Sequence, residues 1–290
     1  MTTMANRTRK PLPLVLFAAL LTVSAWLSAI LPAQAETKHR NVAIGNGLLV
    51  DIHAPREANK LRFFRRKKVP VIVYVHGGGW IKGSKAKVYD LPGFANDRGW
   101  MVVSVSYRPW PRANIDQQVA DVTRGIRWTQ RNIRKYGGDP KRIVIMGHSA
   151  GSHLVSMVSA QKKVRGLRGV VANDVQAYDM NAYAAMRGSL PHMYAKAFGT
   201  TPKNWARWSP ITYVKKGRRF PPHLIIYSGL NIYDRRRRLS RDFGNALKRR
   251  GTRVSYFDGR NYSHGAVMRR IGNDRALTGT LESFLKRAFR

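Results

Sequence analysis

Residues 142–151 read RIVIMGHSAG, a short β-branched run followed at once by a serine between small residues. The run Arg142–Met146 predicts a buried strand, and His153–Ala160 has helical character. Small neighbours let the strand and the helix approach closely, and a serine on such a tight turn projects its hydroxyl clear of the sheet. The helix would also direct the positive end of its dipole at developing negative charge. We therefore predict that Ser149 is a nucleophile; the alternative is a glycine-rich turn with an incidental serine.

A second glycine cluster follows an earlier strand. Val69–Val75 (VPVIVYV) predicts a buried strand, and His76–Trp80 directly after it read HGGGW. Acyl transfer develops an oxyanion, on which free backbone N–H groups must converge. Consecutive glycines let the chain turn its amides toward one point. We therefore predict that the amides of Gly78 and Gly79, with that of Ala150, form an oxyanion hole, rather than a merely flexible loop.

A serine hydroxyl needs a base to remove its proton, and histidine is the usual base near neutral pH. His264 lies in a loop after the last predicted strand, Val254–Phe257. His192 falls in a stretch without a clear strand, and His223 begins a strand. We predict His264 as the base; the alternative is a surface histidine without a function.

The acid that orients His264 must be an aspartate, because the chain has no glutamate between Ser149 and this histidine. Asp234 comes after the predicted strand Leu224–Tyr227 and fits the order serine, acid, histidine along the chain. It is our first choice. Asp174, at the end of an earlier strand, is the second choice, because the acid can stand at that neighbouring strand end. The alternative for Asp234 is that it only pairs with the arginines that follow it.

Short β-branched runs alternate with helix-like segments through most of the chain. Met101–Tyr107 and Gly169–Ala172 read as further strands, whereas Asp116–Lys135 and residues 239–247 carry apolar side chains at helical spacing. Strands buried on both faces and alternating with helices predict an α/β fold with a doubly wound, mostly parallel sheet. The stretch 175–215 predicts a small cap insertion over the carboxyl edge of the sheet, where ligands bind in open α/β sheets.

The first 35 residues have the pattern of an export signal. Three bases between residues 7 and 10 precede an apolar run at 14–30, and residues 32–35 read PAQA, an A-x-A cleavage pattern. We predict a signal peptide at residues 1–35 and a catalytic domain at 36–290, exported to the periplasm or secreted. An uncleaved anchor helix is the alternative.

The net charge of +38 comes from 53 basic and 15 acidic residues, and the chain has no cysteine. The lack of cysteine excludes a disulfide framework, a thiol nucleophile and a thiolate metal site. Such a charge often marks proteins that bind nucleic acid or an anionic surface. The bases are spread along the whole chain and no nucleic-acid motif is present. We therefore expect no specific nucleic-acid partner; adaptation to a polyanionic envelope and binding to an anionic envelope surface both stay open.

The run Arg235–Arg238 predicts positive potential near the site entrance, with a solvated helix face as its alternative.

The motifs together resemble the α/β-hydrolase fold serine esterases, especially the carboxylesterase and hormone-sensitive-lipase-like group, with relatives that resemble feruloyl esterases and kynurenine formamidase. The shared pattern is HGGGW at 76–80, YR at 107–108, GGDP-x-R at 137–142 and GHSAG at 147–151. The resemblance covers roughly residues 41–290. The family usually places its acid three residues after a glycine, but here Ile232 stands three residues after Gly229.

The resemblance implies hydrolysis of a small-molecule carboxylic ester through an acyl-enzyme. It implies no metal or organic cofactor, and no His/Asp cluster in the sequence has ligand spacing. Two alternatives stay open: an amidase or formamidase with the same triad, and a catalytically silent basic protein that binds the envelope.

Overall fold

The structure is a computed structural model, and it describes residues 37–56, 58, 68–230 and 233–290. The signal sequence predicted at residues 1–35 lies outside the described residues. Within the described part of the chain, no helix is long and apolar enough to cross a membrane.

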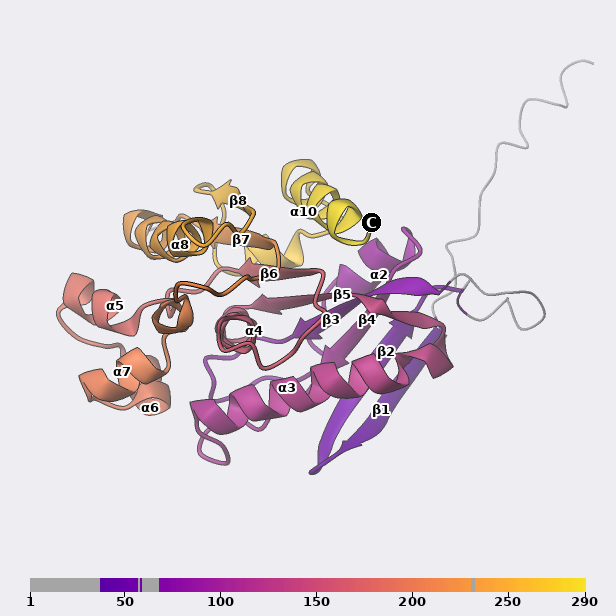
Figure 1. The fold of residues 1–290 in the computed structure, drawn as a ribbon, viewed down its shortest axis with the longest axis horizontal. Coiled ribbons are helices and arrows are strands. Elements are labelled where there is room, and N and C mark those ends of the chain that lie inside the picture. The colour runs from indigo at the N-terminus through magenta and orange to yellow at the C-terminus, as the bar shows by residue number, and fades with distance from the viewer. Residues whose placement is uncertain (1–36, 57, 59–67, 231–232) are drawn as a thin grey trace, which may run out of the picture. The chain divides into compact units, whose positions relative to one another are not determined.

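One eight-stranded sheet, in the order β1-β2-β4-β3-β5-β6-β7-β8, forms the centre of the domain (Figure 1). Strand β2 pairs antiparallel with β1 and β4, and every other pairing is parallel. The predicted α/β fold with a mostly parallel, doubly wound sheet is confirmed. The strands are β1 (Thr37–Gly45), β2 (Leu48–Ala54), β3 (Val69–Val75), β4 (Met101–Val105), β5 (Gly138–His148), β6 (Gly169–Asn173), β7 (His223–Ser228) and β8 (Val254–Gly259).

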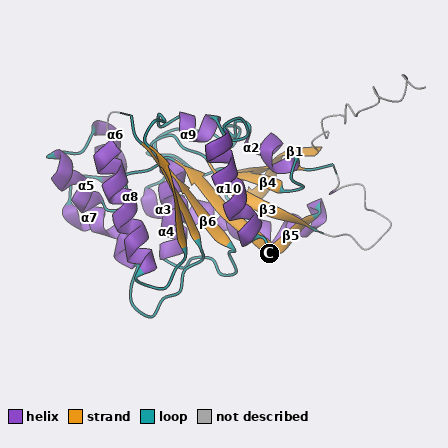
Figure 2. Cartoon of the chain, turned by 90° about the horizontal axis from the view of Figure 1, so that it is seen from above, coloured by secondary structure: helices purple, strands orange, loops and turns teal. Residues whose placement is uncertain are grey.

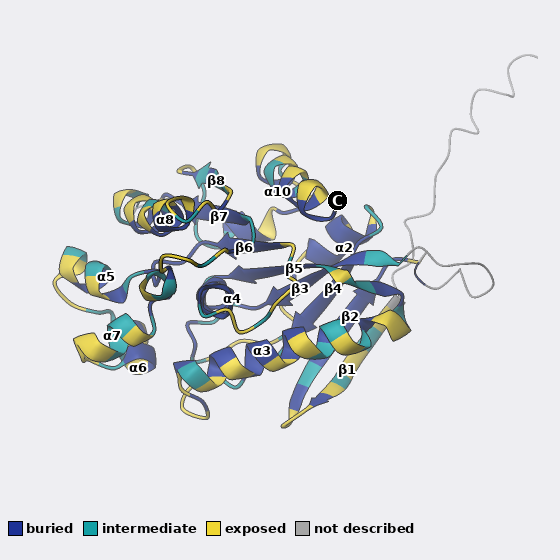
Figure 3. Cartoon of the chain, viewed as in Figure 1, coloured by how far each residue is buried: buried dark blue, intermediate teal, exposed yellow. Residues whose placement is uncertain are grey.

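Helices cover both faces of this sheet (Figure 2). Side chains of α3 (Ile115–Asn132), α4 (Ala150–Ala160) and α8 (Tyr233–Lys248) join one apolar cluster. Those of α2 (Leu91–Asn96), α9 (Ala266–Arg269) and α10 (Arg275–Ala288) join the other. The inner strands are buried along their whole length (Figure 3), as in β4, β6 and β7. Because both faces are covered, these strands read as continuous apolar runs.

The stretch between β6 and β7, in which we expect a cap, holds three short helices and a 3₁₀ turn. These are α5 (Met180–Arg187), α6 (His192–Phe198), α7 (Pro202–Arg207) and η2 (Pro210–Tyr213). Helix α5 contacts both α7 and α8. The rings of Tyr194 and Phe198 on α6 pack edge-on against Trp80, which ends the HGGGW segment. Helix α6 is thereby attached to the glycine-rich loop that follows β3.

Candidate active site

Ser149 stands between β5 and α4 in a backbone conformation that side chains rarely adopt, with φ 57° and ψ −124°. The neighbouring glycines are required by close backbone approach. A Cβ on Gly147 would lie 2.2 Å from the carbonyl oxygen of Gly151, and one on Gly151 would lie 2.1 Å from that of Val75. The strained turn predicted from GHSAG is therefore present, and it presents Ser149 at the carboxyl edge of the parallel strands.

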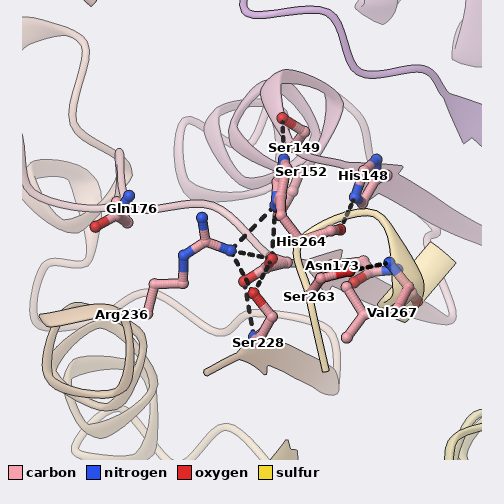
Figure 4. Close-up of polar contacts among 12 residues, drawn as sticks. His148, Ser149, Ser152, Asn173, Gln176, Ser228, Arg236, Ser263, His264 and Val267 are labelled. Carbon is pink, nitrogen blue, oxygen red and sulfur yellow. Dashed lines mark hydrogen bonds and ion pairs between the residues drawn. The ribbon is translucent and has the colours of Figure 1, made fainter. Parts of the chain in front are cut away.

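His264 lies beside this serine, with its Nε2 atom 2.9 Å from the Ser149 Oγ atom (Figure 4). Two hydrogen bonds hold the loop that carries it: His148 Nε2 donates to the His264 carbonyl at 2.9 Å, and Asn173 Nδ2 donates to the Val267 carbonyl at 2.9 Å. The rings of His148 and His264 stack at 4.8 Å. Burial lowers the pKa of His148 to about 4, so that ring is neutral near pH 7.

Asp174 is the carboxylate that contacts His264, with 2.6 Å between Asp174 Oδ2 and His264 Nδ1. It follows β6 directly, it is fully buried, and its φ of 61° lies in the left-handed region that side chains rarely adopt. Burial by itself would raise the pKa of Asp174, but the hydrogen bond from His264 and the charge of Arg236 lower it to about 2. The carboxylate is therefore ionised throughout the neutral range.

The prediction that Asp234 orients His264 is wrong in this geometry. Asp234 lies in the first turn of α8 and is exposed, whereas Arg236, two residues further on, is buried. Residues two apart on a helix point about 200° from each other, so the two side chains face opposite directions. The strand order explains the outcome: β6 is the direct neighbour of β5, and its end lies closer to Ser149.

The glycine loop packs against the serine, since a Cβ on Gly77 would lie 2.9 Å from the Ser149 Cβ atom. Gly78 and Gly79 have φ values of 135° and 60°, a region that favours glycine. Within the described part of the chain, the amides of Gly78, Gly79 and Ala150 donate to no acceptor. The three predicted oxyanion donors are therefore unpaired in the loop and helix end that lie next to Ser149.

Buried polar contacts that the sequence did not reveal hold this loop in place. Gln118 Nε2 on α3 donates to the Trp80 carbonyl at 2.9 Å, and Trp80 Nε1 donates to His153 Nδ1 at 3.1 Å. The HGGGW and YR motifs also meet here, because the Tyr107 ring stacks on the His76 ring at 4.4 Å. The spacing of the two motifs gave no sign of this contact.

Three further residues lie at the site: His148 and Ser228 were not predicted, and Arg236 was predicted only as part of a basic run near the entrance. His148 is the variable residue of the GHSAG motif, which is the only signal that the sequence offered for it. Ser228 ends β7 and donates from its backbone N–H to Asp174 Oδ1 at 2.9 Å and from its hydroxyl to Asp174 Oδ2 at 2.6 Å.

For metal binding, the described residues contain no cluster of three or more His, Cys, Asp or Glu side chains that could hold an ion.

The sheet order, the serine turn and the histidine after β8 define the α/β-hydrolase fold, to which the solved structures that resemble this chain also belong. Among them is "Truncated form of carbohydrate esterase from gut microbiota", with a TM-score of 0.70 and 19% identity over 89% of this chain and 98% of that chain. Another is "Bacterial Heroin Esterase", with a TM-score of 0.68 and 18% identity over 91% of this chain and 87% of that chain.

Within this fold, residues 50–186 match the family described as BD-FAE. Esterase LipQ of Mycobacterium tuberculosis is 30% identical over 236 residues, which are 76% of this chain and 55% of LipQ. The isoprenylcysteine alpha-carbonyl methylesterase ICME of Arabidopsis thaliana is 34% identical over 120 residues, 41% of this chain and 26% of that protein. The chain spans about half the length of LipQ.

Proposed function

We propose that the protein is a serine hydrolase of carboxylic esters. The observation that carries this proposal is the pair of hydrogen bonds that links Ser149 Oγ to His264 Nε2 and His264 Nδ1 to Asp174 Oδ2, next to unpaired backbone amides. Several similar proteins are named as esterases, which supports the same class of reaction.

The geometry allows the following sequence of steps. His264 Nε2 takes the proton of Ser149 Oγ as this oxygen attacks the ester carbonyl carbon, and the imidazolium is stabilised by Asp174. The amides of Gly78, Gly79 and Ala150 stabilise the oxyanion. The tetrahedral intermediate collapses, the alcohol leaves with the proton from His264, and Ser149 is acylated. Water, deprotonated by His264, then hydrolyses the acyl-enzyme and frees the serine.

The test is a parallel assay of p-nitrophenyl esters of increasing acyl length and of N-formyl aryl amides, together with labelling by a fluorophosphonate probe. We expect turnover of the esters and stoichiometric labelling. Faster turnover of the formamides would favour the amidase alternative. A folded protein that is neither labelled nor active on either class would identify a catalytically silent protein and contradict the proposal.

Gly79→Ala is expected to lower kcat by about 10²–10³, the cost of losing one oxyanion donor. A Cβ at this position would displace the Met193 side chain, whose Sδ atom lies 2.1 Å from it, and the φ of 60° is strained for alanine, so the amide of residue 79 is expected to shift. Steady-state kinetics on one p-nitrophenyl ester measure the effect. Gly47→Ala is the matched control, because φ is 67° there and nothing lies within 4 Å of the added carbon. An equal loss in both variants would show that backbone strain, not the oxyanion hole, is responsible.

We also propose that the protein is exported, on the basis of residues 1–35 alone. Material recovered from the periplasm or the medium should then begin at Glu36 when its N-terminus is sequenced. Recovery of the chain only from the cytoplasm, with residues 1–35 intact, would contradict export.

A further inference from the structure

Four consecutive arginines, Arg235–Arg238, lie near the start of α8, and their side chains have different surroundings. Arg236 is only 8% exposed, whereas Arg237 and Arg238 are exposed. Arg235 donates from Nε to Gln176 Oε1 at 2.8 Å. The run Arg235–Arg238 was predicted to supply positive potential at the entrance. One of its charges, that of Arg236, instead lies inside the protein next to Asp174.

The buried guanidinium contacts the acid and its neighbours (Figure 4). Arg236 Nη1 donates to Asp174 Oδ2 and to Ser228 Oγ, and it lies 3.1 Å from His264 Nδ1. His264 Nδ1 and the Ser228 hydroxyl, each 2.6 Å away, are the other partners of the same carboxylate oxygen. Asp174 thus has a fixed orientation with three partners around Oδ2, one of them a permanent cation.

The charge of Arg236 matters because the proposed reaction creates a second cation at His264. A carboxylate favours the imidazolium form of a neighbouring histidine, and a cation at the same distance opposes it. The buried group that faces His264 is therefore an ion pair of Asp174 and Arg236, not an isolated anion. His148, which stacks on His264 from the end of β5, is neutral near pH 7 and adds no charge there.

We propose that Arg236 is a positioning residue of the active site: it fixes the Asp174 carboxylate against His264, and its positive charge offsets part of the negative charge that Asp174 presents to His264. This inference rests on the esterase function proposed above. Arg236 acts through Asp174 and His264, and the geometry assigns it no contact with the reacting atoms.

The test compares the pH dependence of kcat/KM for the wild-type enzyme and for Arg236→Gln. Glutamine removes the charge, but its amide N–H groups can still donate to Asp174. Without the cation, protonation of His264 becomes easier, so activity should be lost at a higher pH on acidification. We expect the acidic limb of the profile to move upward by about one pH unit or more. At its plateau, kcat should fall by about 10–10², with KM nearly unchanged, because the triad is less precisely oriented.

Arg237→Gln is the matched control, since it removes the same charge from an exposed neighbour on α8. Its pH profile should coincide with that of the wild type. An acidic limb that is unchanged in Arg236→Gln, or that moves equally in Arg237→Gln, overturns the inference. A wild-type protein that the fluorophosphonate probe does not label contradicts the esterase function itself, so the two failures are distinguishable.

Arg236→Lys provides a second measurement in case Arg236→Gln shows no cooperative thermal unfolding. Lysine keeps the charge but cannot reproduce the planar geometry of the guanidinium. For Arg236→Lys, we expect the acidic limb of the pH profile to stay at the wild-type position. Its kcat should fall, and its KM should stay unchanged. Wild-type values of both kcat and KM in a folded Arg236→Lys enzyme would contradict the positioning role.

Discussion

Ser149→Ala is expected to lower kcat by about 10⁶, the scale measured when subtilisin loses its catalytic serine. The loss is this large because Ser149 is the only group in the proposed mechanism that forms the covalent bond. Its hydroxyl lies 2.9 Å from His264 Nε2, and its φ of 57° is part of the strained turn between β5 and α4. Labelling by the fluorophosphonate probe should disappear completely. Both readouts can be measured on protein whose thermal unfolding resembles that of the wild type.

Ser84→Ala serves as the matched control for this prediction, because Ser84 is exposed and lies in the chain segment just after the glycine loop. It should retain activity and labelling. If Ser149→Ala kept either of them, another nucleophile would have to be sought, and the serine hydrolase mechanism would fail.

Asp174→Asn is expected to lower kcat by about 10⁴, the loss reported for a triad aspartate replaced by its amide. Both carboxylate oxygens of Asp174 accept hydrogen bonds, from His264, Ser228 and Arg236. An asparagine has only one oxygen, and its NH₂ group would face one of these donors. The histidine is therefore expected to adopt the wrong tautomer or orientation. Steady-state kinetics on the best ester measure the change, and a thermal melt checks that the buried Arg236, now without its counter-charge, has not unfolded the domain.

Asp234→Asn is the decisive comparison. Asp234 is exposed on α8, and an exposed substitution of this kind should change activity by no more than about twofold. The opposite result, with Asp234→Asn crippling and Asp174→Asn mild, would return the acid to the position after β7 and contradict the hydrogen bonds of the structure.

The position of the histidine beside Ser149 could be predicted from the sequence, whereas the position of the carboxylate that contacts this histidine could not. His264 was predictable because one strand, β8, precedes it and the chain is short between them. Which aspartate contacts His264 depends on which strand end lies nearest to it. Strands β6 and β7 are parallel neighbours and end at the same edge of the sheet, so the sequence offers both positions. One feature of the sequence argued against Asp234: Ile232 stands at the position where the family usually has its aspartate.

Local sequence was enough to predict the parts of the fold that depend on neighbours along the chain. The continuous apolar runs predicted the inner strands, because strands buried on both faces need apolar side chains throughout. The glycines of HGGGW and GHSAG predicted the oxyanion loop and the serine turn, because those backbone conformations and close approaches exclude larger residues.

Tertiary packing determined which residues far apart in the chain contact one another. It selected Asp174 over Asp234, it placed His148 against the His264 loop, and it buried Arg236 out of a run of four chemically identical arginines. The direction of a side chain on α8 follows from the rotation of that helix as it packs on the sheet through Leu239 and Phe243. Since a buried charge is tolerated only beside a partner, the position of Asp174 and the rotation of α8 together fix which arginine is inside.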